Sequence, residues 1–263
     1  MIPRILNYVW IGERDLPEPD RTYVEGWSKA CPGWEIRRWG LDDVKDVDCR
    51  FLRETLAAKK WVFACDWLRL YALSKTGGFY LDTDVELKSS LEPFRDNDLC
   101  MGLNESGYPQ TALIGSVPGQ REILELLEET SSRKFILGPG IYDETANNSV
   151  FMEMFKRKGI DLKALGQDAE TEVSPGVKFY PASVLCRPKG SLPNVAWHHA
   201  AGYWLEPYRR KSAVDLPFSL RLVRMKKRKK IAKKTDALNL LADERLIASA
   251  NFGRMVFALV RRI

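Results

Sequence analysis

The chain has 263 residues, of which 45% are hydrophobic and 29% charged, and its formal net charge is +6. This length and composition suit one large α/β domain with a C-terminal appendage. Five cysteines at irregular spacings, with no CxxC pair, argue against a disulfide framework or a zinc site and indicate a reducing compartment. No stretch reaches the roughly 18 apolar residues that a membrane-spanning helix needs. We therefore expect a soluble or peripheral protein of the cytoplasm.

Apolar residues recur with strand or helix periods along most of the chain. In chain order, the pattern predicts a strand at 2–11, a helix at 21–30, a strand at 34–39, helices at 51–58 and 62–74, strands at 79–81, 85–87, 99–103 and 111–114, helices at 119–131 and 148–158, and a β-prone run at 177–184. Asp20 is placed to cap the first helix. Trp10, near the end of the first strand, is either a core residue or part of a site. The pattern predicts an α/β fold whose first strand belongs to a parallel sheet.

Two carboxylates follow the strand at 79–81. Asp82 and Asp84 are one residue apart, and on an extended chain alternate side chains share a face, with Cα atoms about 6–7 Å apart. That spacing lets both carboxylates reach one hard cation, directly or through its water. The alternative interpretation is a solvated turn. The preceding strand is apolar enough to be central, however, and α/β sheets usually place ligands at the carboxyl ends of strands.

The helix before this strand carries a charged pair in an otherwise apolar stretch. Asp66 and Arg69 are three residues apart and therefore lie on one face of the helix. We expect this pair to be partly buried and the two charges to be paired with each other. Its presence favours a site over a solvated turn at Asp82 and Asp84.

The two histidines of the chain, His198 and His199, are adjacent and follow an apolar run. A single histidine is more often structural than a ligand. Here two of them occur in a chain whose carboxylate pair needs a third metal ligand, so a structural role and a ligand role both stay open.

Two ordered runs carry a resemblance to a known family: Asp66-x-x-Arg69-x-Tyr71-x-Leu73, and Gly77-Gly78-x-Tyr80-x-Asp82-x-Asp84. They resemble the glycosyltransferases with a sugar-binding DXD region, which include bacterial capsule and lipopolysaccharide transferases and yeast mannosyltransferases, with the clostridial glucosylating toxins as distant relatives. The resemblance covers roughly residues 2–204. It implies a GT-A-type, Rossmann-like nucleotide-sugar-binding domain, which we place at residues 1–212, and retaining transfer of a hexose to a saccharide acceptor.

The resemblance also implies a metal site. Asp84, helped by His199 and by Asp82 through water or ribose, would hold Mn²⁺ or Mg²⁺. His198 would be the neighbour on the phosphate side, although the order of the two histidines stays open. Trp204 would close over the diphosphate of the donor.

Further residues would bind the donor, on the same resemblance. Asp66 and Arg69 would position the donor sugar and ribose, and Trp10 would stack near the base. Tyr80 is expected among the donor-binding residues. Gln110 or Thr111 occupies the position at which an amide or hydroxyl group contacts the donor sugar in many relatives, so one of these, with Thr111 preferred, is expected there. The segment 137–140, Leu-Gly-Pro-Gly, is either an acceptor-side segment or a generic loop.

Residues 213–263 differ from the rest in composition and are expected to form a helical, basic extension. Nine basic residues and no acid lie between Arg221 and Lys234, and without them the chain would carry about −3. The segment either lies on an anionic membrane surface, binds nucleic acid, or presents a solvated helix face. We favour peripheral association with the inner face of the membrane, because a polysaccharide-building enzyme needs a lipid-linked acceptor, and we expect no nucleic-acid partner.

The predicted function is therefore metal-dependent transfer from a nucleotide sugar, a UDP-hexose or alternatively GDP-mannose, to a saccharide or lipid-linked saccharide in cell-surface polysaccharide or glycolipid synthesis. A DXD-bearing phosphotransferase or nuclease would show further carboxylates or a phosphate-cradling glycine loop, and Gly77-Gly78 precedes a strand rather than joining a strand to a helix. A non-catalytic carbohydrate- or nucleic-acid-binding protein is the remaining alternative, but it gives no reason for the four charged site residues to occur together.

Overall fold

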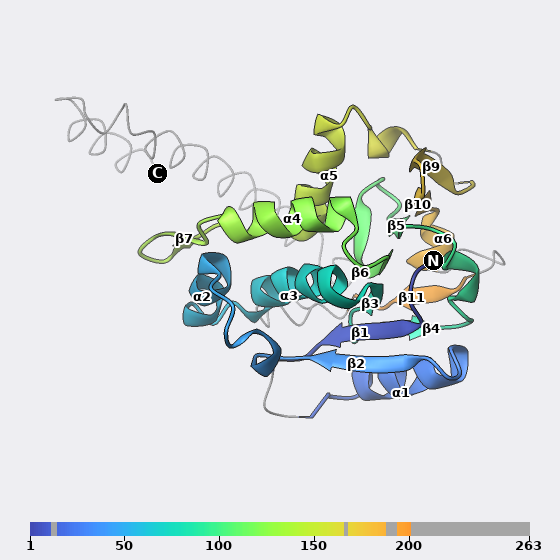
Figure 1. Ribbon diagram of the computed structural model, residues 1–263, viewed down its shortest axis with the longest axis horizontal. Helices are drawn as coiled ribbons and strands as arrows, with labels where there is room; N and C mark the ends of the chain where they lie inside the picture. Colours follow the sequence, from blue (N-terminus) through green and yellow to red (C-terminus); the bar gives the residue numbers. More distant parts are fainter. Residues whose placement is uncertain (12–14, 166–167, 188–193, 201–263) are drawn as a thin grey trace, which may run out of the picture. The chain divides into compact units, whose positions relative to one another are not determined.

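The structure is a computed structural model and describes residues 1–11, 15–165, 168–187 and 194–200 (Figure 1). The strands are β1 (Ile5–Val9), β2 (Glu35–Trp39), β3 (Gly78–Leu81), β4 (Val85–Leu87), β5 (Leu99–Leu103), β6 (Pro109–Ser116), β7 (Ile136–Gly138), β8 (Ile141–Tyr142), β9 (Thr171–Ser174), β10 (Val177–Tyr180) and β11 (Ala196–His198). The helices are α1 (Asp20–Ala30), α2 (Arg50–Ala57), α3 (Trp61–Thr76), α4 (Arg121–Ser132), α5 (Asn147–Arg157) and α6 (Ala182–Leu185), with 3₁₀ turns η1 (Asp42–Val44), η2 (Glu92–Phe94) and η3 (Leu162–Ala164). The predicted elements are present, except that the run at 177–184 divides at Pro181 into β10 and α6.

The large sheet has seven strands in the order β2-β1-β3-β6-β5-β10-β9, which Figure 1 shows from bottom to top. β1 is parallel to both β2 and β3, as predicted for the first strand. β6 is antiparallel to β3 and to β5, so the sheet is mixed rather than parallel. As a result, the carboxyl ends of β1, β3, β5 and β10 and the beginning of β6 meet at one edge, which we call the carboxyl edge.

Each face of the sheet has its own apolar core. One core joins residues of α2, α3, α4 and α5 to the sheet, and the other joins residues of α1, β4 and α6 to it. Strand β3 contributes side chains to both cores: Tyr80 belongs to the first core, and Phe79 and Leu81 belong to the second. This division follows from the alternation of side chains along a strand, and it makes β3 a central, fully buried strand.

The turn from α3 into β3 sets how these two elements lie against each other. Gly77 has φ +60 and Gly78 has φ +86, backbone conformations that residues with a Cβ rarely adopt. A Cβ on Gly78 would also lie 2.5 Å from the Ile5 carbonyl oxygen. The side-chain amide of Asn7 donates to the Gly77 carbonyl at 2.8 Å. This tight turn brings the helix back along the strand, so that α3 side chains reach the carboxyl end of β3.

The predicted α/β class is confirmed, and the sheet fits the expected GT-A-type arrangement. All five cysteines are free, as their spacing predicts. Among the described residues, no helix is long and apolar enough to cross a membrane. The predicted basic extension at 213–263 lies outside the described residues, so its helical structure and membrane role stay predictions.

Candidate active site

Asp82 and Asp84 lie where the chain turns from β3 into β4, at the carboxyl edge. The Asp82 N–H donates to the Ala112 carbonyl at 2.8 Å, and the Val85 N–H closes the turn on the Asp82 carbonyl at 3.0 Å. The prediction of an extended Asp82–Asp84 segment is therefore wrong, because the backbone bends between the two residues. The turn is not a solvated one either, since Asp84 is only 8% exposed.

Arg69 connects α3 to this turn. Its Nη2 lies 3.0 Å from Asp66 Oδ1 and 3.2 Å from Asp82 Oδ1, and its Nη1 donates to the Thr111 carbonyl at 2.7 Å. The Tyr80 hydroxyl also donates to Asp82 Oδ1, at 2.7 Å. All of these contacts to Asp82 fall on Oδ1, so its Oδ2 takes no part in them. The expected buried pairing of Asp66 with Arg69 is confirmed.

Burial governs the charge states around Arg69. Burial alone would lower the pKa of Arg69, but the charges of its carboxylate neighbours outweigh it and keep that pKa above its usual value. Burial raises the pKa of Asp66 to about 6, although the attraction of Arg69 opposes the rise. Burial and the nearby charge of Asp82 raise the pKa of Tyr80 well above its ordinary range, so its hydroxyl acts as a donor. At neutral pH the site therefore has one fixed cation between two carboxylates.

Asp66→Asn is expected to stabilise the protein at pH 8. Because the pKa of Asp66 rises from 3.8 to about 6, the folded state binds more protons than the unfolded state between these pH values, and stability falls as pH rises through that window. The rise in the pKa of Asp66 from 3.8 to about 6 corresponds to a cost of about 3 kcal/mol for ionising this carboxyl in the folded state. An uncharged amide would avoid that cost. Denaturant unfolding at pH 4 and pH 8 measures the effect: the gain should be small at pH 4 and largest at pH 8. An equal gain in stability at both pH values would show that the ionisation of Asp66 is not its cause.

Strand β11 brings His198 beside the two carboxylates. It pairs antiparallel with β4, with His198 opposite Val85. The Nε2 of His198 lies 3.3 Å from Asp84 Oδ1, and one ligand atom from each of Asp82, Asp84 and His198 lies within 4.8 Å of the others. The Nδ1 of His198 is 2.7 Å from the Gln110 side-chain nitrogen. This contact restricts the orientation of the imidazole ring.

This arrangement can hold a divalent cation. Two carboxylate oxygens and an imidazole nitrogen form a donor set that fits Mn²⁺ or Mg²⁺. Burial disfavours the charged form of His198, but its hydrogen bond to Asp84 and the charge of Asp84 outweigh burial and raise the pKa of His198. The carboxylates therefore create a strongly negative field at the imidazole, which is the field that a bound cation would neutralise.

His199 lies outside this cluster. Its Nε2 is 3.0 Å from Glu86 Oε2, and its ring stacks between those of Tyr23 and Trp197, with centroids 4.5 and 4.4 Å away. The preferred order of the two histidines, with His199 as the metal ligand, is therefore reversed in the structure. Adjacent side chains of a strand point to opposite faces, and the register of β11 against β4 turns His198 toward the carboxylates.

The remaining predicted site residues fall into three groups. Gln110 and Thr111 both reach the site, Gln110 through its side chain on His198 and Thr111 through its carbonyl on Arg69. Trp10 lies half-buried just beyond β1, at the carboxyl edge, and its backbone N–H donates to the Trp39 carbonyl at 3.0 Å. Trp204 lies outside the described residues, so its closure over a diphosphate stays a prediction.

Asp20 belongs to the site, and the sequence did not indicate this. Asp20 is fully buried and accepts a hydrogen bond at 2.6 Å from the hydroxyl of Thr83, the residue between the two site aspartates. It is the first residue of α1, whose N-cap is Pro19, so the predicted capping role is wrong. An aspartate before a helix has the same local pattern whether it caps that helix or supports a distant turn, and only the packing of α1 against β4 separates the two.

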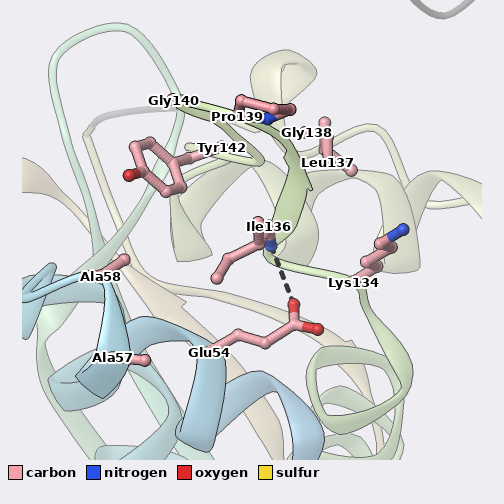
Figure 2. A pocket seen from close by; sticks show the side chains of 10 residues that line it. All are labelled: Glu54, Ala57, Ala58, Lys134, Ile136, Leu137, Gly138, Pro139, Gly140 and Tyr142. Carbon is pink, nitrogen blue, oxygen red and sulfur yellow. Dashed lines mark hydrogen bonds between the residues drawn. The ribbon is translucent and has the colours of Figure 1, made fainter.

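A hollow of about 540 Å³ lies between α2 and the β7–β8 hairpin, and Figure 2 shows the residues that line it. Its walls include Ala57 and Ala58 on one side and the segment 138–140 on the other, and the Ile136 N–H donates to the Glu54 carboxylate at 2.8 Å. None of the predicted metal- or donor-binding residues lines this hollow. An acceptor-side role for the segment 137–140 therefore stays a prediction.

Comparison with known proteins identifies the region that contains these residues. Residues 17–101 match the family described as the glycosyltransferase sugar-binding region containing DXD motif. No curated protein matches the chain at a significant level. Two solved structures share a distant likeness: the PaToxG glycosyltransferase (15% identity, 60% of this chain and 70% of that chain, TM-score 0.48), and a glycosyltransferase involved in the glycosylation of the major capsid of PBCV-1 (10% identity, 81% and 100%, TM-score 0.47). Residues 17–101, with Asp66, Arg69, Asp82 and Asp84, thus form a DXD-containing sugar-binding region, and the chain is a glycosyltransferase.

Proposed function

We propose that this glycosyltransferase depends on a divalent cation, Mn²⁺ or Mg²⁺, and that Asp82, Asp84 and His198 hold it. The observation that carries this proposal is the convergence of their ligand atoms within 4.8 Å of one another. The family implies a nucleotide-sugar donor and a saccharide acceptor. A cation at this position would neutralise the charge that develops on the leaving nucleoside diphosphate.

The protein groups around the cluster have distinct roles in this proposal. Asp84 and His198 supply ligand atoms directly. Asp82 supplies Oδ2, because its Oδ1 already accepts from Tyr80 and pairs with Arg69. Arg69 therefore orients Asp82 and balances its charge before any ligand binds, which reduces the reorganisation that binding would require.

The donor is proposed to lie along the carboxyl edge. Asp66 and Arg69 would position its sugar and ribose, and Trp10 would stack near the base, since it follows β1 and β1 is the direct neighbour of β3. We propose a UDP-hexose as donor, with GDP-mannose as the alternative, and transfer with retention of the anomeric configuration. The acceptor is proposed to be a saccharide or lipid-linked saccharide of the cell surface, with residues 213–263 on the membrane surface.

The test is release of nucleotide from UDP-glucose, UDP-galactose and GDP-mannose, measured with Mn²⁺, after EDTA, and after Mn²⁺ is restored. We expect release from at least one donor to stop with EDTA and to return with the metal. Release that EDTA leaves unchanged would contradict the metal role. No release and no nucleotide binding would contradict both the proposed donors and the proposed metal site.

A further inference from the structure

A second hollow of about 550 Å³ lies between the β5–β6 loop, α5 and η3. Its lining includes Tyr108 from the loop, Ser149, Met152 and Glu153 from α5, and Lys163 from η3. This volume is within the range of small-molecule sites, roughly 300–1,000 Å³. We call it the Tyr108 groove. It contains none of the residues assigned to the metal or to the donor.

Both walls of the groove are connected to the proposed metal site. The loop from β5 to β6 lies at the carboxyl edge, and Tyr108 comes two residues before Gln110, whose side chain contacts His198 at 2.7 Å. On the other wall, Ser149 comes two residues after Asn147, whose buried side chain donates to the Asp66 carbonyl at 2.9 Å. On both sides, therefore, a residue that lines the groove is two positions along the chain from a residue that contacts the proposed site.

Close packing of the β5–β6 loop against η3 fixes one wall of the groove. Gly107 has φ +76, and a Cβ there would lie 2.8 Å from the Lys163 Cα, so the loop approaches η3 as closely as only a glycine allows. The Lys163 ammonium lies 4.6 Å from the centroid of the Tyr108 ring. The Asn104 side chain accepts from the Tyr108 N–H at 3.0 Å. These contacts hold Tyr108 at one side of the groove.

The chemistry of the groove suits a neutral, hydroxyl-rich ligand. Its floor combines apolar groups, Met152, Ile160 and Leu162, with the aromatic ring of Tyr108. Its charged side chains are two acidic and two basic groups, Glu153, Asp161, Lys156 and Lys163, which give no net charge. An apolar surface with a few convergent polar groups is the usual composition of a small-ligand site.

We propose that the Tyr108 groove binds the saccharide acceptor, an inference that rests on the proposed function. The donor nucleotide is placed over β1, on one side of β3, and the groove opens beyond β6 and β5, on the other side. An acceptor hydroxyl has to approach the donor sugar from the side that the nucleotide does not occupy. The groove lies on that side, and it lies between the two elements that contact His198 and Asp66.

The test is saturation-transfer NMR with methyl α-glucoside, methyl α-mannoside, methyl β-galactoside, maltose, lactose and cellobiose, in the presence of Mn²⁺ and UDP. The variants are Tyr108→Ala and Glu153→Gln, an exposed glutamate of α5. The matched control is Glu128→Gln, an exposed glutamate of α4 outside the groove. We expect at least one saccharide to bind the wild type, with its dissociation constant raised at least tenfold in Tyr108→Ala and about threefold in Glu153→Gln, and unchanged in the control.

The outcomes separate this inference from the proposed function. Metal-dependent UDP binding should be the same in all four proteins, because none of the changes touches the metal site. If the wild type binds UDP but no saccharide, or if both groove variants bind a saccharide as tightly as the wild type, the groove is not the acceptor site. If the wild type binds no nucleotide at all, the proposed function itself fails. Glu153→Gln keeps the test decisive if Tyr108→Ala does not fold.

Discussion

Asp84→Asn is expected to lower kcat/KM for sugar transfer by about 10³-fold, the loss typical of removing a group that stabilises developing charge. Asp84 is buried, contacts His198 at 3.3 Å, and is proposed to ligate the cation through a charged oxygen. Asparagine keeps the size of the side chain but removes the charge, so the fold should persist while metal affinity falls. Steady-state turnover over a range of Mn²⁺ concentrations measures both effects.

The matched control is Asp46→Asn, a change of the same kind at an exposed aspartate. It should leave kcat/KM within about twofold of the wild type, since surface substitutions of this kind are usually nearly neutral. An Asp84→Asn enzyme with wild-type rates and an unchanged requirement for Mn²⁺ would show that Asp84 is not a ligand.

Arg69→Met is expected to cause the largest loss of stability of any single change in the site. Arg69 is 6% exposed and pairs with both Asp66 and Asp82, so its removal leaves two carboxylates without their buried positive charge. Breaking a buried pair in this way typically costs about 3–5 kcal/mol. In a domain of this size, each kcal/mol lowers the melting temperature by about 2–4 °C. Differential scanning calorimetry should therefore show a fall of about 6–20 °C.

Arg121→Met is the control for this prediction. Arg121 also pairs with a carboxylate, Glu125, at 2.9 Å, but its side chain is 80% exposed. An exposed pair contributes about 0–1 kcal/mol, so the melting temperature should change by no more than about 4 °C. Equal losses for the two variants would mean that burial between Asp66 and Asp82 is not what makes Arg69 important.

Much of the fold followed from local pattern. The strand at 79–81, the helix before it and the glycines between them have strong local signals: an apolar run, a helical period, and a turn that only glycine adopts easily. The pairing of Asp66 with Arg69 was predictable for the same reason, because both lie on one helix three residues apart. The mixed sheet was not predictable, since the direction of β6 depends on its long-range pairing with β3 and β5.

The details of the site depended on tertiary contacts. The sequence placed two histidines near the carboxylates, but the register of β11 against β4 decides which of them faces the cluster. Gln110 and Thr111 were alternatives for one role, whereas the structure gives each a different contact: Gln110 contacts His198 through its side chain, and Thr111 contacts Arg69 through its backbone carbonyl. Asp20 had the local pattern of a helix cap, and its hydrogen bond to Thr83 joins residues 63 positions apart.

The measurement that tests the central claim most directly is the thermal shift caused by UDP with and without Mn²⁺, in the wild type, His198→Ala and His199→Ala. A ligand at a hundred times its dissociation constant stabilises the folded state by about 2.7 kcal/mol. Our account predicts a shift in the wild type that requires Mn²⁺, its loss in His198→Ala, and its persistence in His199→Ala. A thermal shift that needs no metal would contradict a cation site made by Asp82, Asp84 and His198. A shift that is lost in His199→Ala but kept in His198→Ala would contradict it too.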